Sequence, residues 1–176
     1  MKDSSGARPR ASTIRARLPL QAAHRAVLER VCSRLPLDDL DWALTGSLGA
    51  RLQGVDVEVH DVDIQTSERD VGAAASLLDE FVTSPLHEWI SDRMRSQFAR
   101  FSIDGVEVEL MAGMQKRTSI DVGWSEPVSP CEHRVIVLLD DLEIPVLSLE
   151  YEARAYEEIG RHERAAQLRA VAGLYK

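Results

Sequence analysis

The stretch Leu44-Thr45-Gly46-Ser47-Leu48, followed by Asp61-Val62-Asp63-Ile64, decides the fold of this chain. An apolar start, a Gly-Ser turn and an alternating segment predict a strand, a turn, a short helix and a second strand. Side chains two residues apart on a strand point to the same side, so Asp61 and Asp63 are expected to project together. Two carboxylates held that close repel each other unless a cation lies between them. The pair therefore predicts a cation site.

The Gly-Ser turn is suited to an anion. Gly46 lets a phosphate approach the backbone closely because it has no side chain, and Ser47 adds a hydroxyl. The helix expected over residues 48–53 presents unpaired N–H groups at its N-terminus. Acids that bind a metal and a turn that binds phosphate, within one short unit, together indicate a nucleoside triphosphate.

A later hairpin supplies a third carboxylate. Asp104-Gly105 is a strong signal for a two-residue turn, so the strands on either side of it are expected to pair antiparallel. The second of these strands carries Glu107 and Glu109 on one face. If this strand lies beside residues 61–64, a third acid joins the aspartate pair. Three hard oxygen ligands suit Mg²⁺, which prefers octahedral oxygen coordination.

The rest of the chain predicts an α+β (α/β) protein. Residues 1–18 are rich in Ser, Ala and Arg and are expected to be a mobile N-terminal tail. Residues 19–147 are expected to form the α/β domain, and residues 148–176 a C-terminal helical segment packed on it. By periodicity and breaker residues, helices are expected over 20–34, 48–53, 67–81, 148–159 and 161–171, and strands over 42–45, 60–65, 86–90, 97–103, 106–111, 134–139 and 143–147.

The composition narrows the function classes. The chain has 176 residues, of which 44% are hydrophobic and 28% charged, as in an ordinary globular protein. Its formal net charge of −8 argues against broad binding to nucleic acid. No apolar run is long enough to span a membrane, and no apolar segment of a secretory signal follows the N-terminal arginines. Cys32 and Cys131 show no metal-binding spacing and fit reduced thiols, so the cytoplasm is the expected location.

The motifs together resemble the nucleotidyltransferase superfamily, which has the polymerase-β-like fold. The resemblance rests on Gly46-Ser47, on Asp61-Val62-Asp63 and on an acid in a later strand, and it covers about residues 42–111. The surrounding sequence is similar to that of small bacterial members. These include the minimal nucleotidyltransferases and the enzymes that nucleotidylate antibiotics. The resemblance implies a short mixed β-sheet backed by helices.

The resemblance also implies the site residues. Asp61, Asp63 and Glu109 would be the catalytic acids and would ligate two Mg²⁺ ions, and Gly46 and Ser47 would bind the β- and γ-phosphates of the nucleotide. Apolar residues flank Glu109, as they flank the third acid of the family, and this favours it as the third ligand.

Two features depart from the family pattern. The third acid is commonly Asp in the family, so Glu109 reaches further, and residues 55–59 form an apparent insertion before the aspartate pair. Glu107 shares the face of Glu109 and stays an alternative to it. Glu150, on the helix that follows the sheet, is a candidate general base.

The implied activity is the Mg²⁺-dependent transfer of a nucleoside monophosphate from a nucleoside triphosphate, ATP by preference, to a hydroxyl acceptor. Pyrophosphate is released. The acidic charge favours a small molecule or a protein as the acceptor over an RNA end. The chain carries little beyond the catalytic core, so a homodimer partner or a toxin partner is expected to complete the acceptor pocket. The alternative is a non-catalytic nucleotide-binding module, or a toxin–antitoxin partner, on the same fold.

Overall fold

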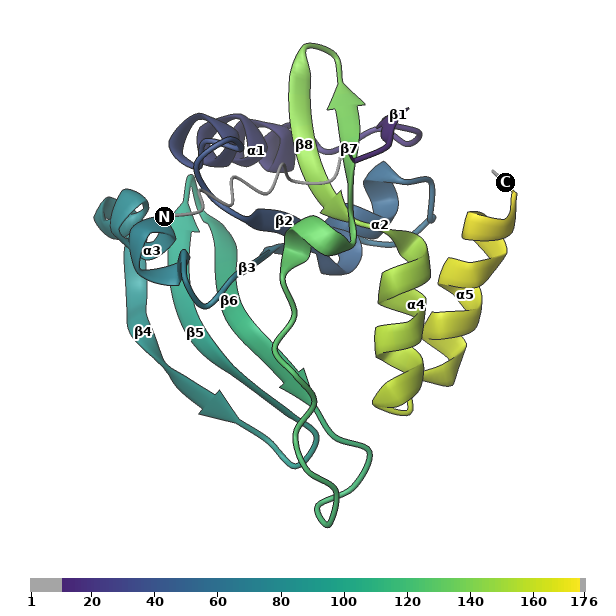
Figure 1. The fold of residues 1–176 in the computed structure, drawn as a ribbon. Helices are drawn as coiled ribbons and strands as arrows, with labels where there is room; N and C mark the ends of the chain where they lie inside the picture. The colour runs from purple at the N-terminus through teal and green to yellow at the C-terminus, as the bar shows by residue number, and fades with distance from the viewer. Residues whose placement is uncertain (1–10, 175–176) are drawn as a thin grey trace, which may run out of the picture.

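The computed structural model describes residues 11–174, in which helices pack around one eight-stranded mixed sheet (Figure 1). The strands are β1 (Thr13–Arg15), β2 (Trp42–Thr45), β3 (Val62–Thr66), β4 (Val82–Ile90), β5 (Met94–Ile103), β6 (Val106–Lys116), β7 (Arg134–Leu139) and β8 (Leu142–Leu147). The helices are α1 (Ala22–Arg34), α2 (Gly46–Leu52), α3 (Val71–Leu77), α4 (Leu149–Glu158) and α5 (His162–Gly173). The strand order is β1-β7-β8-β2-β3-β6-β5-β4, which confirms the predicted α+β class with a mixed sheet.

The predicted hairpin joins β5 to β6. Asp104 and Gly105 have φ angles of 51° and 81°, the left-handed pair of a tight two-residue turn that Asp tolerates and Gly adopts freely. The strands pair antiparallel from Ile103 opposite Val106 to Met94 opposite Lys116. Strand β6 is therefore longer than the strand predicted over residues 106–111, because pairing with β5 carries it on through residues 112–116.

Strand β3 lies between β2 and β6, and its pairing with them aligns the predicted site residues. Thr45 of β2 lies opposite Asp63, and Asp63 lies opposite Glu109 of β6. Arg100 of β5 lies opposite Glu109 in turn. These four residues form a row across four strands, which we call the carboxylate row. The predicted approach of a hairpin acid to Asp63 is thereby confirmed.

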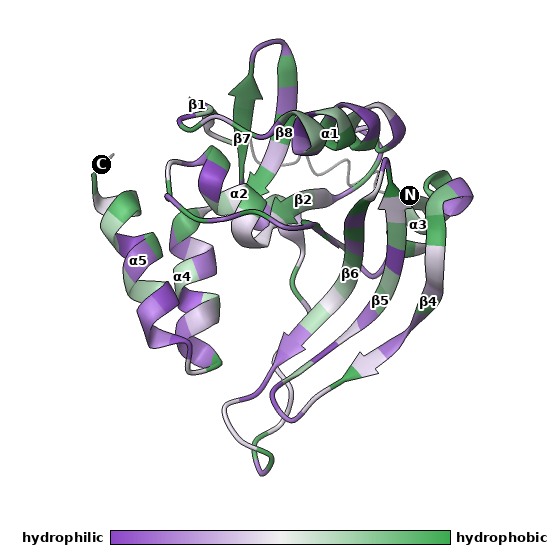
Figure 2. Ribbon diagram, turned by 180° about the vertical axis from the view of Figure 1, so that it is seen from behind, coloured by the Kyte–Doolittle hydropathy of each residue, from purple (hydrophilic) through white to green (hydrophobic). Residues whose placement is uncertain are grey.

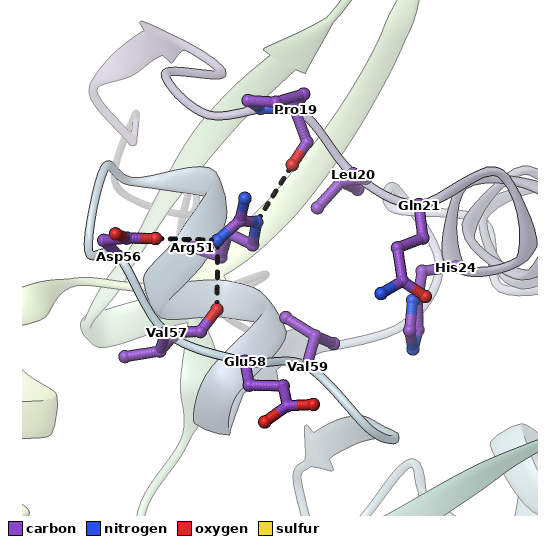
Figure 3. Close-up of a pocket in the computed structure, with 9 residues that line it drawn as sticks. All are labelled: Pro19, Leu20, Gln21, His24, Arg51, Asp56, Val57, Glu58 and Val59. Atoms are coloured by element: carbon purple, nitrogen blue, oxygen red, sulfur yellow. Dashed lines mark hydrogen bonds and ion pairs between the residues drawn. The ribbon is translucent and has the colours of Figure 1, made fainter.

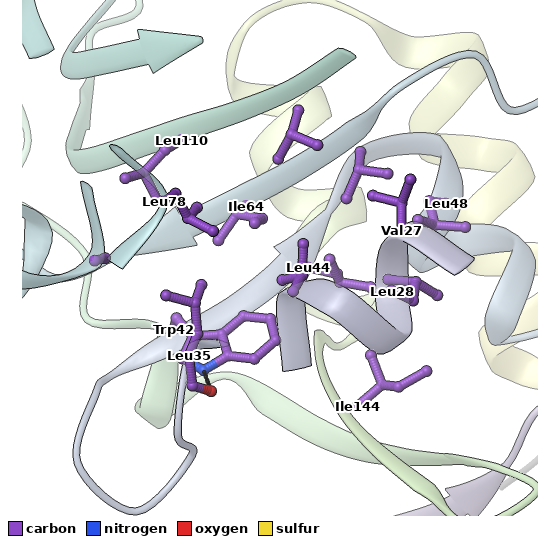
Figure 4. Close-up of a cluster of buried hydrophobic side chains, with 14 of the residues drawn as sticks. Val27, Leu28, Leu35, Trp42, Leu44, Leu48, Ile64, Leu78, Leu110 and Ile144 are labelled. Atoms are coloured by element: carbon purple, nitrogen blue, oxygen red, sulfur yellow. Dashed lines mark hydrogen bonds between the residues drawn. The ribbon is translucent and has the colours of Figure 1, made fainter. Parts of the chain in front are cut away.

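The other face of the same strands carries the main hydrophobic core (Figure 4). Because side chains alternate along β3, Ile64 enters this core while Asp63 points to the opposite side. Val27 and Leu28 of α1 pack there, and Trp42 donates its indole N–H to the carbonyl of Leu35 over 3.1 Å. Full burial of each such aliphatic side chain contributes about 1.5–3 kcal/mol. Figure 2 shows hydrophobic and hydrophilic residues side by side on α1, as expected for a helix that covers a core on one face.

The C-terminal helices α4 and α5 lie side by side and pack on α2 (Figure 1). Ser148 precedes α4, and its hydroxyl accepts a hydrogen bond from the backbone N–H of Tyr151 over 3.3 Å. A second apolar cluster, separate from the main core, contains Ala50, Val55, Leu149, Ala153 and Leu168. This cluster fixes α4 relative to the Gly-Ser turn at the start of α2.

Several further boundaries differ from the predictions. The helix expected over residues 67–81 is shorter, since α3 covers Val71–Leu77, and β4 already begins at Val82. Thr13–Arg15, within the segment expected to be a tail, forms β1 and pairs parallel with β7. The expectation is wrong for these residues because the open edge of a sheet can bind an extended backbone regardless of its side chains. Residues 1–10 of that tail lie outside the described residues. Strand β3 begins at Val62, so Asp61 lies just before the strand and not on it.

Within residues 11–174, none of the helices has the length and apolar character needed to cross a membrane. Cys32 and Cys131 are both free thiols, and burial raises the pKa of Cys32 to about 12. The cytoplasmic location stays a prediction.

Candidate functional site

The carboxylate row borders a cavity of about 200 Å³ between the sheet and α4. Three of the five predicted site residues, Gly46, Asp63 and Glu109, line this cavity. Ser47 is the second residue of α2, and Asp61 is half-buried just before β3; neither lines it. The structure thus brings the two motifs and the hairpin acid to one place, with Ser47 and Asp61 at its margin.

Gly46 and Asp63 are in close contact, which explains why the turn carries a glycine. Gly46 has a φ angle of 69°, and a Cβ atom built on it would lie 2.1 Å from Oδ2 of Asp63. A side chain would therefore clash with the carboxylate and strain a left-handed backbone. The Gly-Ser turn and the Asp-x-Asp segment are one packed unit.

We expect Gly46→Ala to destabilise the protein by about 1–3 kcal/mol and to displace the Asp63 carboxylate. The matched control is Gly72→Ala in α3, where an added Cβ would meet no atom within 4 Å. That change should stabilise the helix by about 0.5–1 kcal/mol. Urea unfolding of the two variants measures both effects. A Gly46→Ala protein as stable as the wild type would contradict the contact.

Asp63 lies at a concentration of negative charge. Burial raises the pKa of its carboxyl group to about 8, together with the neighbouring carboxylates of Asp61, Glu109, Glu152 and Glu107. Each of these four neighbouring carboxylates disfavours the charged form of Asp63. A cation bound at this carboxylate would favour its charged form and so lower its pKa.

Glu109 has a different environment, because Arg100 lies 3.0 Å from its carboxylate. Burial raises the pKa of Glu109, and the Arg100 guanidinium opposes this shift. Glu107, the alternative third acid, lies opposite Ser102 of β5 and is exposed. The register therefore favours Glu109 over Glu107 as the acid that accompanies Asp63.

The donor set fits a hard divalent cation in its chemistry. Asp61, Asp63 and Glu109 offer carboxylate oxygens, the ligands that Mg²⁺ prefers, where negative charge is unbalanced. In the part of the chain that the structure describes, no three acidic, histidine or cysteine side chains stand in a metal-binding arrangement. Glu109 is held by Arg100 instead. Arg100 uses one of the two carboxylate oxygens of Glu109, so the other oxygen is the one that a cation at this site would take.

Glu152 of α4 is a further carboxylate of the cavity, and we did not predict it from the sequence. It accepts hydrogen bonds from the Thr45 hydroxyl and from the backbone N–H of Gly46. Burial raises the pKa of this carboxyl group. Glu150, the candidate base, is exposed instead, because residues two apart on a helix point in different directions. The spacing of Leu149, Glu152, Ala153 and Tyr156 on one helix face could have identified Glu152.

Basic side chains line another part of the cavity. Lys116, at the end of β6, has its ammonium 3.9 Å from the Glu158 carboxylate and 5.3 Å from the centre of the Tyr151 ring. Burial lowers the pKa of Lys116. Arg161 lines the cavity as well. The cavity thus combines acids from the row with cations from β6 and the segment after α4.

A second cavity, of about 350 Å³, lies where the apparent insertion passes the start of α1 (Figure 3). Arg51 braces it by donating to the carbonyls of Pro19 and Val57 over 2.9 and 3.0 Å, and to Asp56 over 3.2 Å. None of the predicted site residues lines this cavity. The longer connection over residues 55–59 is packed and leaves the pairing of Thr45 with Asp63 intact.

Comparisons with known proteins agree with this architecture. TM1012 from Thermotoga maritima, which carries a provisional assignment as a nucleotidyltransferase, is 37% identical and has a TM-score of 0.77, over 89% of this chain and 96% of that one. ANT(2'')-Ia in complex with adenylyl-2''-tobramycin is 10% identical with a TM-score of 0.51, over 88% of this chain and all of that one, a likeness of fold alone.

No curated protein matches the sequence. The model of the family named aminoglycoside-2''-adenylyltransferase matches residues 27–172, a range that includes the Gly-Ser turn, the carboxylate row and α4. The chain therefore belongs to this family and is a nucleotidyltransferase.

Proposed function

We propose that this nucleotidyltransferase moves the nucleoside monophosphate of ATP to a hydroxyl group of an acceptor and releases pyrophosphate. The observation that supports this most directly is the register of β3 and β6, which places Glu109 beside Asp63. The contact of Asp63 with Gly46 adds the phosphate-binding turn to the same unit.

In this proposal Asp61, Asp63 and Glu109 hold two Mg²⁺ ions. When bound, the metal would lower the pKa of the acceptor hydroxyl and neutralise charge on the pyrophosphate. Gly46 leaves room for the β- and γ-phosphates because it has no side chain, and Ser47 binds them through its backbone N–H group and its hydroxyl. Each of these roles uses a side chain or backbone group that lies in or beside the cavity.

We further propose that the acceptor is a small, hydroxylated and cationic molecule. The carboxylates of Asp63, Glu109 and Glu152 attract such a molecule, and the net charge of −8 repels RNA. The family name and the adenylylated tobramycin bound to ANT(2'')-Ia point to aminoglycosides as the first class to examine. The completion of the acceptor pocket by a second copy of the chain or by a toxin partner stays a prediction.

The test is pyrophosphate release from Mg-ATP in the presence of a panel of aminoglycosides, with a neutral sugar as the control acceptor. We expect release only with an amino sugar and only with Mg²⁺, accompanied by an acceptor whose mass has increased by one adenylyl group. Removal of the metal with EDTA should stop the reaction. Tight ATP binding without pyrophosphate release, with every acceptor class including proteins, would favour the non-catalytic module instead.

A further inference from the structure

Two buried polar groups of the cavity have no role in the transfer proposed above. Gln65 lies two residues after Asp63 on β3, and Tyr151 lies in the first turn of α4. Their side chains are only 4% and 9% exposed, and both line the cavity. The two side chains lie within hydrogen-bonding reach of each other, but within the described residues neither Nε2 of Gln65 nor the hydroxyl of Tyr151 has a partner of good hydrogen-bond geometry. Buried polar groups are nearly always paired, so this pair calls for an explanation.

The two groups are neighbours and are both able to bind a polar ligand. Burial and the Glu152 carboxylate raise the pKa of Tyr151 to about 12, although the nearby Gln65 amide lowers it. The phenol is therefore protonated at neutral pH and can donate one hydrogen bond and accept another. The amide adds both a donor and an acceptor. Together they form a small polar edge in the wall of the cavity.

The walls around this edge are apolar and adaptable. Met111 lies opposite Gln65 on β6. This pair is two residues along the strands from the pair of Asp63 and Glu109 and lies on the same face of the sheet. Met94, Met114 and Ile159 line the cavity as well. Methionine thioethers pack well against aromatic rings. Apolar walls with a few convergent polar groups are typical of a site for a flat heterocycle.

The position of the edge relative to the acids fits a nucleotide. Two residues along a strand span about 6–7 Å, which is the separation of Gln65 from Asp63 along β3. A nucleotide whose α-phosphate lies at Asp63 can therefore place its base at Gln65, because only one ribose separates the phosphate from the base. This step rests on the proposed function, because it requires the phosphate at Asp63.

We propose that Gln65 and Tyr151 form the recognition edge of a nucleobase subsite and select adenine. A glutamine amide pairs with adenine by accepting from the 6-amino group and donating to a ring nitrogen. The Tyr151 hydroxyl supplies one further hydrogen bond, and the methionines enclose the ring. The acceptor then approaches the α-phosphate from outside this subsite.

The variants Gln65→Leu and Tyr151→Phe test this proposal. Each removes a group that has no hydrogen bond of good geometry in the free protein, so neither should lower thermal stability. Phenylalanine also keeps the ring that stacks on His133, with ring centres 4.3 Å apart. We expect each change to weaken Mg-ATP binding about tenfold, the effect of one lost hydrogen bond. Binding of inorganic tripolyphosphate, which has no base, should not change.

The sharper measurement is base preference. Purine riboside triphosphate lacks only the 6-amino group of ATP, so the wild type should bind ATP about tenfold more tightly. In Gln65→Leu the two nucleotides should bind equally. The control is Tyr156→Phe, which removes a second tyrosine hydroxyl from the same cavity and should keep the preference for ATP.

Two results would overturn this inference while leaving the proposed transfer in place. One is an unchanged ATP preference in both variants. The other is a raised KM for the acceptor with unchanged nucleotide binding, which would assign the cavity to the acceptor. A wild type that binds neither ATP nor tripolyphosphate and releases no pyrophosphate would overturn the proposed function, and this inference with it.

Discussion

Replacing Asp63 with Asn is expected to reduce nucleotidyl transfer by roughly a thousandfold or more and, at the same time, to make the folded protein more stable. The loss of activity follows because Asp63 is the acid shared by the carboxylate row and the Gly-Ser turn. An amide occupies nearly the same volume but carries no charge to hold a cation. Transfer is measured as pyrophosphate release.

The gain in stability follows from the pKa of Asp63, which is about 8 in the folded protein and 3.8 in its ordinary state. Folding therefore favours the protonated form of Asp63. The free energy of unfolding falls as pH rises from about 4 to about 8, because the unfolded chain releases this proton while the folded protein retains it. We expect Asp63→Asn to be about 1–3 kcal/mol more stable at pH 7, because the half-buried carboxylate is partly screened by water. The difference should disappear near pH 4.

Magnesium provides a measurement that does not depend on activity. Added Mg²⁺ should raise the Tm of the wild type at pH 7 and leave that of Asp63→Asn unchanged, because a ligand stabilises only the state that binds it. Glu143→Gln, which removes an exposed acid from β8, should respond to Mg²⁺ as the wild type does. Equal responses in wild type and Asp63→Asn would show that the ion binds elsewhere.

Truncation of Glu152 to alanine is expected to destabilise the protein by about 2–4 kcal/mol. The change leaves the Thr45 hydroxyl and the Gly46 N–H without their acceptor and opens a void beneath α4. Glu152→Gln retains one acceptor oxygen and the volume of the side chain, and it removes a buried charge. We therefore expect it to be within about 1 kcal/mol of the wild type.

Urea unfolding followed by tryptophan fluorescence measures these differences. Glu150→Ala is the matched control, because Glu150 lies on the same helix but is exposed, and its loss should change stability by less than about 0.5 kcal/mol. If Glu152→Ala unfolds at the same urea concentration as Glu150→Ala, Glu152 is not the acceptor that holds the Gly-Ser turn.

The local parts of this fold were predictable because they depend on residues close together in the chain. Asp104-Gly105 favours a left-handed two-residue turn wherever it stands between alternating strands, and the structure has that turn. Strand β1 was not predictable, because its pairing with β7 depends on an open sheet edge and not on the side chains of Thr13–Arg15.

The candidate site, like the fold, was predictable only in part. The sequence predicted Gly46, Asp63 and Glu109, and these residues line one cavity. It did not distinguish Glu109 from Glu107 by geometry, because both share a face; the register of β6 with β3 separates them. Asp61 was expected on the strand, but the sheet pairing begins one residue later.

By itself, the sequence determined the strand-turn-helix unit at Gly46, the hairpin at Asp104-Gly105 and the alternation that puts Asp63 on one face and Ile64 on the other. These follow from backbone preferences and from the two-residue period of a strand. Only the tertiary structure decided that Glu152, and not Glu150, reaches the cavity, and that Gln65 lies beside Tyr151. Contacts between segments so distant in the chain depend on how α4 packs against the sheet, and no local pattern specifies that packing.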